Sequence, residues 1–552
     1  MRRRPWLIGL LAGIVTGLLH FAAFPPWDVA EAAYVFVVPM LLWLLARPTR
    51  QQTIICSFLG FWLSWLLLIA WLRYVHPPMG SVGLVLLSFI LGMFPMSWAV
   101  LARWFLPTVM LCGFGARLLA LLGLAGYWVI LEWLKTWVLT GFPWLPLAAS
   151  QWQRPPMLQT AEYGGQYAVS FILIFFNLTL AVYIYRLFLQ PILKSRQAEP
   201  TEDMAEGEAT ARLKLRWRFC PEFYVALALV FLSVWLYVRT IAKAQAREPI
   251  FNVAVVQPWI PADLKWTHEM VEENLSTLRG LTEQASQLTP KPDLILWPEA
   301  APPYPMIRQD GDRNMEHWIQ GGVDKVGVPL MTGALAEFPN GDWANAIFLL
   351  EPENGLFDGY YSKRRLVPFG EYIPMRDALF FVKTVVPLDI DLKPGDHSRP
   401  LPLTVNGKTW KVGALICYED IFARLGREVA REGADFIAVL TNDGWYGEEA
   451  GAYQHAAHSV LRAVETRRPV IRCGNHGWSG WIDEYGNVRD VLTGPDGLIY
   501  ARATKSFALS YDPVWQDQLT FYARYGDWVL WGGGCFLLGA IWQRRRQRRS
   551  GI

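Results

Sequence analysis

The stretch GALICYED at residues 413–420 decides the fold of this chain, because it is expected to join a buried strand to a helix at a reactive residue. Apolar residues lead up to Cys417, two carboxylates follow it, and an amphipathic stretch begins at 423. A thiol at a strand end beside a helix start gains thiolate character from the helix dipole. The stretch is therefore a candidate nucleophile presented by an α/β fold, although a buried structural cysteine is the favoured interpretation when the stretch is taken alone.

The same alternation extends on both sides of this stretch, over residues 249–512. Short β-branched runs end in polar loops, and helix-length amphipathic stretches lie between them, which is typical of a layered α/β domain. Functional residues in such folds gather at strand ends. The predicted strands cover residues 251–256, 294–297, 346–350, 412–417, 436–440 and 469–472, and the predicted helices cover 267–287, 423–433 and 453–467.

Two further strand ends carry charged residues. The run PDLILWPE at 292–299 ends on Glu299. A glutamate in this position is expected to have a raised pKa and to take a proton from a thiol near neutral pH. The run YSKRRLVPFGE at 361–371 contains Lys363, whose ammonium would stabilise a developing oxyanion. Taken singly, Glu299 could be a surface carboxylate and Lys363 a solvated charge.

Composition places part of the chain in lipid. Of its 552 residues, 53% are hydrophobic and only 18% are charged. The net charge of +3 and the scattered arginines give no support to a nucleic-acid partner. The six cysteines are too scattered for a disulfide framework and form no CxxC pair, so we expect neither a metal nor a cofactor.

Apolar runs of spanning length recur outside the α/β segment, and they predict about eight membrane spans. With both termini in the cytoplasm, the loops rich in Lys and Arg all fall on the cytoplasmic side. Residues 1–248 would then hold seven spans and a solvated cytoplasmic linker at 195–212, residues 249–512 an extracytoplasmic domain, and residues 513–552 the last span and a basic tail. The predicted spans lie near residues 6–24, 31–46, 53–73, 82–103, 116–140, 164–188, 220–240 and 526–543.

The three motifs are more specific together than any one of them. Their order in the chain, Glu299, Lys363 and then Cys417, with these flanking residues, resembles the nitrilase/amidase superfamily. With spans on both sides, the whole chain resembles the apolipoprotein N-acyltransferase family of bacterial cell envelopes. The resemblance implies a membrane α-helical bundle of about eight transmembrane helices joined to a nitrilase-like α-β-β-α sandwich.

The resemblance also implies a role for each matching residue. The catalytic residues would be Glu299 as general base, Lys363 as oxyanion stabiliser and Cys417 as nucleophile. The supporting residues would be Glu371, which orients the lysine, together with Tyr418 and Glu419, and the substrate-binding residues would be Trp144, Trp266 and Trp445.

The reaction implied by this family is transfer of an acyl chain from a phospholipid, through a thioester on Cys417, to the α-amino group of a diacylglyceryl-cysteine. The acceptor would be an apolipoprotein in the last step of lipoprotein maturation. The implied location is the bacterial inner membrane, with the catalytic domain in the periplasm, and we expect a monomer. Long acyl chains need an apolar route to the thiol, since each buried methylene contributes about 0.8 kcal/mol.

Several alternatives remain open at this stage. A membrane-tethered amidase or nitrilase, which passes the acyl group to water, would use the same triad, and a transporter or channel with an inactive nitrilase-like sensor domain is a rival from another class. His455 is a rival base for the nucleophile, although a helix histidine satisfied by hydrogen bonds is favoured. Glu132 and Lys135 are expected to pair on one helix face, and Cys473 is expected to be a buried free thiol.

Overall fold

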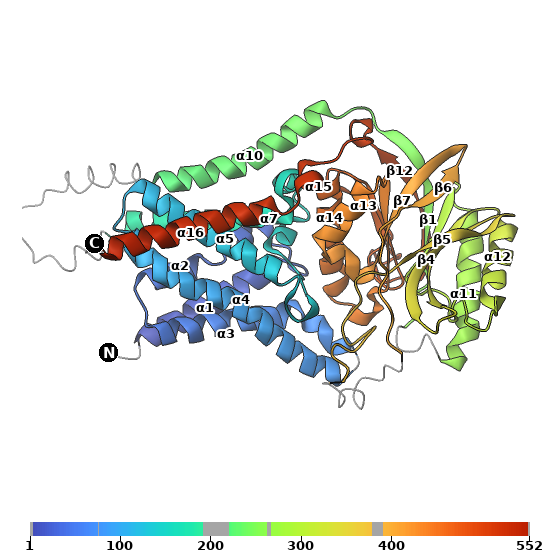
Figure 1. Cartoon of the computed structure of the whole chain (residues 1–552), viewed down its shortest axis with the longest axis horizontal. Coiled ribbons are helices and arrows are strands. Elements are labelled where there is room, and N and C mark those ends of the chain that lie inside the picture. Colours follow the sequence, from blue (N-terminus) through green and yellow to red (C-terminus); the bar gives the residue numbers. More distant parts are fainter. Residues whose placement is uncertain (1–3, 76, 191–219, 262–266, 378–389, 550–552) are drawn as a thin grey trace, which may run out of the picture.

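A bundle of long apolar helices and a domain of two packed sheets lie next to each other along the longest axis of the molecule (Figure 1). The computed structural model describes residues 4–75, 77–190, 220–261, 267–377 and 390–549. The chain leaves the bundle after α10 (Pro221–Lys243) and returns to it through α16 (Trp528–Arg549). The sheet domain is therefore tethered to the helices at two places.

Six helices in the described part of the chain are long and apolar enough to cross a membrane. They are α1 (Arg4–Ala22), α3 (Arg50–Leu68), α4 (Met79–Val109), α5 (Phe114–Leu134), α7 (Ala161–Ile184) and α10. The predicted span at 31–46 instead forms η1 (Ala30–Tyr34) and α2 (Val38–Leu45), which are too short. The predicted span at 526–543 lies in α16, where arginines and three consecutive glycines lower the hydropathy. Eight spans therefore stay a prediction.

Although α16 is less apolar than the other long helices, it packs directly against one of them. A Cβ atom added to Gly126 of α5 would lie 2.5 Å from the Cα of Gly533 in α16. Only glycine on both helices allows the two backbones to approach so closely, as small residues do between membrane helices. The last helix is therefore part of the bundle.

The second body contains two six-stranded sheets among its described residues. The first sheet has the order β12 (Ala503–Tyr511), β1 (Glu248–Gln257), β2 (Leu294–Trp297), β3 (Leu330–Glu337), β4 (Trp343–Glu351) and β5 (Gly355–Ser362). The second has the order β11 (Val488–Val491), β10 (Gly480–Ile482), β9 (Val470–Gly474), β8 (Phe436–Thr441), β7 (Lys408–Ile416) and β6 (Leu401–Val405). Strands β1, β2 and β3 run parallel, as do β7, β8 and β9. The strands predicted for this region are confirmed.

Helices complete a four-layer sandwich around the sheets (Figure 1). Apolar side chains such as Phe251, Val412 and Phe436 fill the space between the two sheets. On one outer face lie α11 (His268–Ser286) and α12 (Asn314–Val326), and on the other lie α13 (Ala423–Arg431) and α14 (Gly451–Thr466). The predicted α-β-β-α sandwich is confirmed. Because α13 and α14 face the membrane helices, the second sheet is the one next to the bundle.

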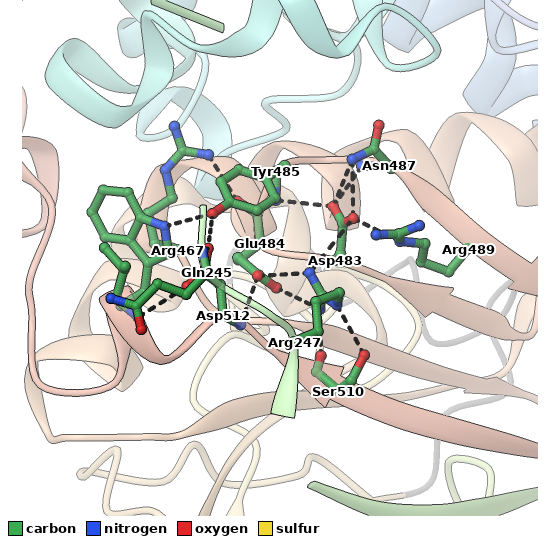
Figure 2. Close-up of polar contacts among 12 residues, drawn as sticks. Gln245, Arg247, Arg467, Asp483, Glu484, Tyr485, Asn487, Arg489, Ser510 and Asp512 are labelled. Carbon is green, nitrogen blue, oxygen red and sulfur yellow. Dashed lines mark hydrogen bonds and ion pairs between the residues drawn. The ribbon is translucent and has the colours of Figure 1, made fainter. Parts of the chain in front are cut away.

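A polar cluster joins the two places where the chain enters and leaves the sandwich (Figure 2). Arg247, just before β1, donates two hydrogen bonds to the carboxylate of Glu484, at 2.8 and 2.9 Å. The same carboxylate accepts from the backbone N–H of Asp512, which directly follows β12, at 2.9 Å. Arg467, which follows α14, donates to the backbone carbonyl of Glu484 at 2.9 Å. The two tethers therefore meet at one buried glutamate.

Candidate active site

Cys417 lies at a sharp turn between β7 and the short helix η8 (Cys417–Ile421). Its backbone φ is 48°, in the left-handed region that side chains with a Cβ rarely adopt. Such strained residues persist only where their surroundings hold them, and they cluster at functional sites. The side chain is buried, with 6% of its surface exposed. The turn predicted between strand and helix at residues 413–420 is therefore present, and it directs the Cys417 thiol into the interior.

The structure brings together the three residues that the motifs singled out. Glu299 follows β2 and Lys363 follows β5 in the first sheet, while Cys417 follows β7 in the second. The Lys363 Nζ lies 2.8 Å from Glu299 Oε1 and 2.9 Å from Glu371 Oε1. The Glu299 carboxylate also takes part in a hydrogen bond with the Cys417 thiol. The site is therefore assembled at the adjoining ends of the two sheets.

The charges of this site differ from the expectations drawn from the sequence. Burial favours the neutral form of Glu299, but the Lys363 ammonium and the hydrogen bonds from Lys363, Asn345 and Cys417 together outweigh burial and lower the pKa of that carboxyl. Burial also raises the pKa of the Cys417 thiol, and the Glu299 charge raises it further. The expected raised pKa of Glu299 and the expected thiolate are both wrong, because the sequence does not show how close Lys363 comes or how dry the site is. The resting site is therefore a carboxylate, an ammonium and a thiol.

Lys363 is held between two carboxylates. Burial by itself would lower its pKa, but Glu299 and Glu371 outweigh burial and raise the pKa well above the ordinary lysine value. Glu371 is fixed in turn, since its second oxygen accepts from the backbone N–H of Val367 at 2.7 Å. Lys363 is therefore permanently charged, and Glu371 lies where an orienting residue should lie.

Asn345 is a site residue that the sequence did not single out. Its Nδ2 donates to Glu299 Oε1 at 2.8 Å and to Glu371 Oε1 at 3.0 Å. It lies on β4, one residue before the predicted strand began, and it is buried. A buried amide inside an otherwise apolar strand is the signal that could have found it. Asn345 therefore links the two carboxylates on either side of the lysine.

Glu419 connects the nucleophile strand to the lysine segment. One of its carboxylate oxygens accepts from Ile416 N at 2.8 Å and from the Tyr361 hydroxyl at 2.8 Å. The other accepts from Arg364 N at 2.7 Å and from Arg365 N at 3.2 Å. Burial raises the pKa of Glu419, and these four donors oppose that shift by favouring the ionised carboxylate. Glu419 therefore holds the residues next to Cys417 and Lys363 in one frame.

The aromatic residues expected around the site lie in different places. Tyr418 donates its hydroxyl to the backbone carbonyl of Gly141, in the bundle, at 2.5 Å. Trp144 is buried, and its Nε1 donates to Gln454 Oε1 at 2.9 Å. Trp445 is half-buried, and Trp266 lies outside the described residues. The site is thus in direct contact with the bundle through Tyr418.

Two expectations about other residues can be compared with the structure. Cys473 is a buried free thiol, as expected, and its Sγ lies 3.4 Å from the carbonyl oxygen of Leu296. Glu132 accepts from Trp128 Nε1 at 2.9 Å, while the Lys135 ammonium lies over the ring of Trp65 at 5.0 Å. The two charges attract each other without forming a direct ion pair, because each side chain has a nearer partner, so the expected pairing holds as a charge interaction only.

Two domain families match this chain. The one described as Apolipoprotein N-acyltransferase N-terminal domain matches residues 16–179, and the one described as Carbon-nitrogen hydrolase matches residues 252–509. A Brucella melitensis protein named apolipoprotein N-acyltransferase is 30% identical over 535 residues, which cover 92% of this chain and 91% of that protein. A Geobacter metallireducens protein of the same name is 27% identical, with 99% and 96% covered. Among solved structures, an amidase from Nesterenkonia sp. is 18% identical, has a TM-score of 0.36 and covers 50% of this chain and 95% of its own.

Proposed function

The chain belongs to the apolipoprotein N-acyltransferase family, and from this premise we propose that it moves an acyl chain from a phospholipid to the α-amino group of a diacylglyceryl-cysteine through a thioester on Cys417. The observation that carries the proposal is the buried Glu299, Lys363 and Cys417 cluster beside the membrane bundle, which Tyr418 contacts directly. The catalytic roles follow from the chemistry of these groups.

In the first step the Cys417 sulfur attacks the ester carbonyl of the phospholipid. As the S–C bond forms, the thiol proton passes to Glu299, and the negative charge moves from that carboxylate to the carbonyl oxygen. Lys363 neighbours Glu299 and Glu371, so it can stabilise the new oxyanion as Glu299 becomes neutral. The ester C–O bond then breaks, and Glu299 returns the proton to the leaving lysophospholipid.

In the second step an amine attacks the thioester. The α-amino group must be neutral to attack, and it loses one further proton to Glu299 as the C–N bond forms. The C–S bond breaks, and the proton returns to the Cys417 sulfur. Because each step restores the carboxylate, the ammonium and the thiol, the enzyme exchanges donor for acceptor in a ping-pong sequence.

The remaining residues act around these three. We assign Glu371 to holding Lys363, and Tyr418 and Glu419 to holding the nucleophile turn. Trp266 and Trp445 stay our candidates for contacts with the lipid substrates, whereas the buried Trp144 packs against His455 and Gln454 instead.

The organisation of the whole chain supports action at a membrane surface. We propose an inner-membrane protein with cytoplasmic termini and a periplasmic catalytic domain, which acts as a monomer. In this proposal, residues 1–248 and 513–552 lie in or beside the membrane, and residues 249–512 form the catalytic domain. The arginine-rich end of α16 supports a cytoplasmic C-terminus, because positive residues remain on that side.

Intact mass of the purified protein tests the proposal. After exposure to phospholipid, the protein should gain the mass of one acyl chain, and Cys417→Ser should gain none at neutral pH. Adding a diacylglyceryl peptide should discharge the acyl-enzyme and yield N-acyl peptide. Release of free fatty acid in the presence of that peptide, without N-acyl product, would instead identify a membrane-tethered amidase-like hydrolase.

A further inference from the structure

Behind the nucleophile lies a fully buried cluster of four charged or titratable residues. Asp420 belongs to η8, Asp443 follows β8, His455 lies on α14, and Arg472 lies on β9. All four side chains have 0% of their surface exposed. None of them is used in the two steps of acyl transfer described above. Buried charges are stable only when they are paired and hydrogen-bonded, so the contacts within the cluster decide its role.

His455 is the centre of the cluster and the member that touches the nucleophile residue. Its Nε2 lies 3.1 Å from the backbone carbonyl oxygen of Cys417 and 2.9 Å from Asp420 Oδ1. Its Nδ1 lies 2.9 Å from Asp443 Oδ1 and 2.6 Å from Nη2 of Arg472. Since a carbonyl oxygen can only accept, the Nε2 atom must carry a hydrogen. His455 therefore donates to the main chain of Cys417, and its Nε2 has no free electron pair with which to act as a base.

The charges around the ring act on its protonation in opposite directions, and the Nε2 hydrogen that Cys417 accepts is present in either form. Arg472 donates to Asp420 Oδ2 at 2.6 Å and also contacts the Asp443 carboxylate at 3.3 Å. Burial and the nearby Arg472 disfavour the imidazolium, but Asp420 and Asp443 outweigh them and raise the pKa of His455. When the ring is protonated, two carboxylates balance one guanidinium and one imidazolium. A neutral ring would leave a net negative charge in a dry site.

We propose that His455 is a positioning residue for acyl transfer, which holds the carbonyl of Cys417 and thereby keeps the nucleophile turn in its left-handed conformation. One residue before the nucleophile, the backbone N–H of Ile416 is bonded to Glu419 at 2.8 Å, and the carbonyl of Cys417 itself is bonded to His455 at 3.1 Å. With both sides held, the strained φ of 48° is maintained and the sulfur stays directed at Glu299. The inference rests on the proposed thioester step.

The bundle takes part in this support. The ring of Trp144, which comes from the loop after α5, lies 5.6 Å from the His455 ring and is tilted by 34°. The Tyr446 ring packs edge-on against the same imidazole, with the two ring centroids 5.8 Å apart. Trp144 is in turn fixed by its hydrogen bond to Gln454, the residue before His455. The contact places a membrane-side residue behind the nucleophile rather than in front of it.

A pair of isosteric variants separates the two hydrogen bonds of the ring. The amide nitrogen of glutamine can replace Nε2 and still donate to Cys417, whereas the shorter asparagine reaches only toward Asp443. Both variants remove the same charge, so their difference reports the bond to the nucleophile. We expect His455→Asn to slow thioester formation by about a hundredfold, as a small misplacement of reacting groups does, while His455→Gln stays within tenfold of the native rate.

The measurement is the rate of the intact-mass increase with phospholipid over a range of concentrations and pH. The KM for phospholipid should be unchanged in both variants, because no substrate contact is lost, and the pH profile should keep its shape. His458→Asn, one turn further along α14 and not bonded to Cys417, is the matched control and should acylate at the native rate. A thermal melt of each variant identifies those that fold.

Equal acylation rates for folded His455→Asn and His455→Gln would overturn the inference. So would a fall of the native acylation rate near neutral pH that is absent in His455→Gln, because such a pH dependence would mark His455 as a base. If His455→Asn does not fold, His455→Gln alone decides: a folded variant slowed by more than a hundredfold contradicts the role of the Cys417 bond. Absence of any acyl-enzyme in the native protein would contradict the proposed function instead, so the two failures can be told apart.

Discussion

At the scale of single residues, the site works by moving one negative charge rather than by storing a thiolate. Burial keeps the proton on Cys417, and Lys363 keeps Glu299 ionised. Transfer of the proton during attack neutralises the carboxyl and creates the oxyanion beside the same ammonium. Because the net charge of the buried site never changes, the reaction needs little rearrangement of its surroundings.

The pH dependence of acylation should reflect these shifts. Since the pKa of Glu299 is lowered and that of Cys417 is raised, thioester formation should be constant between about pH 5.5 and 8, with its acid limb below the ordinary glutamate pKa of about 4.3. A lowered folded-state pKa also means that the stability contributed by the Glu299 carboxylate is lost only as pH falls through that limb. Transfer to peptide should decline earlier, below the ordinary α-amino pKa of about 7.7.

Intact mass measured at fixed reaction times at each pH checks the first step, and the yield of N-acyl peptide checks the second. A limb of the acylation rate near pH 7 would contradict the assignment of Glu299 as an ionised base. The comparison with peptide yield guards against a general loss of folding, because unfolding would change both steps together.

Asn345 offers a second prediction at this scale. Replacing Asn345 by alanine removes one donor from two carboxylates, and hydrogen bonds to charged groups contribute about 1.5–3 kcal/mol each. Acylation by Asn345→Ala should therefore fall by roughly tenfold to a hundredfold. Asn345→Asp adds a third carboxylate beside Lys363, so it should raise the pKa of Glu299 and move the acid limb upward. Identical pH profiles for native protein and Asn345→Asp would show that the contact has no electrostatic role.

At the scale of elements, the active site depends on the hydrogen bonds that Glu419 accepts from both sheets, which act as a staple between them. Glu419, just after β7, accepts four donors, of which Arg364 N and Arg365 N belong to the segment after β5. This contact connects the lysine-bearing segment of the first sheet to the cysteine-bearing turn of the second. The staple therefore sets the distance between the two reactive groups.

Glu419→Gln should break this staple. An amide nitrogen would face a donor on at least one side, and leaving a buried donor unsatisfied costs about 1–3 kcal/mol. We expect a lowered Tm and slower acylation, measured by thermal melting and intact mass. Glu428→Gln is a suitable control, because Glu428 binds side chains of Arg364 and Arg424 nearer the surface. Equal effects of the two substitutions would count against the staple.

At the scale of the whole molecule, the catalytic domain is positioned by its two tethers. The chain enters through Arg247 and leaves through Asp512, and both meet Glu484, whose side chain is 1% exposed (Figure 2). Burial raises the pKa of Glu484, and Arg247 opposes that shift. A break at this point would separate the segments through which the chain enters and leaves the sandwich.

Arg247→Ala should show the strength of this junction. It leaves Glu484 buried without its ion pair, and breaking a buried pair costs about 3–5 kcal/mol, here toward the lower end because Arg247 is 22% exposed. The Tm in detergent should fall clearly, and proteases should cut first near the tethers. Lys325→Ala, which removes an ion pair to Glu283 whose side chains are 64% and 40% exposed, should change stability by less than about 1 kcal/mol. Similar melting of both variants would contradict a special role for the junction.

The sequence by itself determined the local features of this protein. The period of apolar residues predicted the strands and helices of 249–512, because side-chain burial in each element repeats with its backbone geometry. The order of Glu299, Lys363 and Cys417 with their flanking residues predicted the site, because each lies at the end of a strand. Apolar runs predicted the long helices, since spanning length is a local property.

Only the tertiary structure decided the features that depend on distant neighbours. The pKa of Glu299 follows from a lysine 64 residues away in the chain. The role of Asn345 follows only from the place of β4 between β3 and β5, which brings its side chain to Glu299 and Glu371. The polar face of α14 is buried rather than solvated, because Arg462 and Glu465 meet Gln166 of α7 in the bundle. Local pattern cannot encode such contacts, since they arise from packing between segments that the chain brings together only on folding.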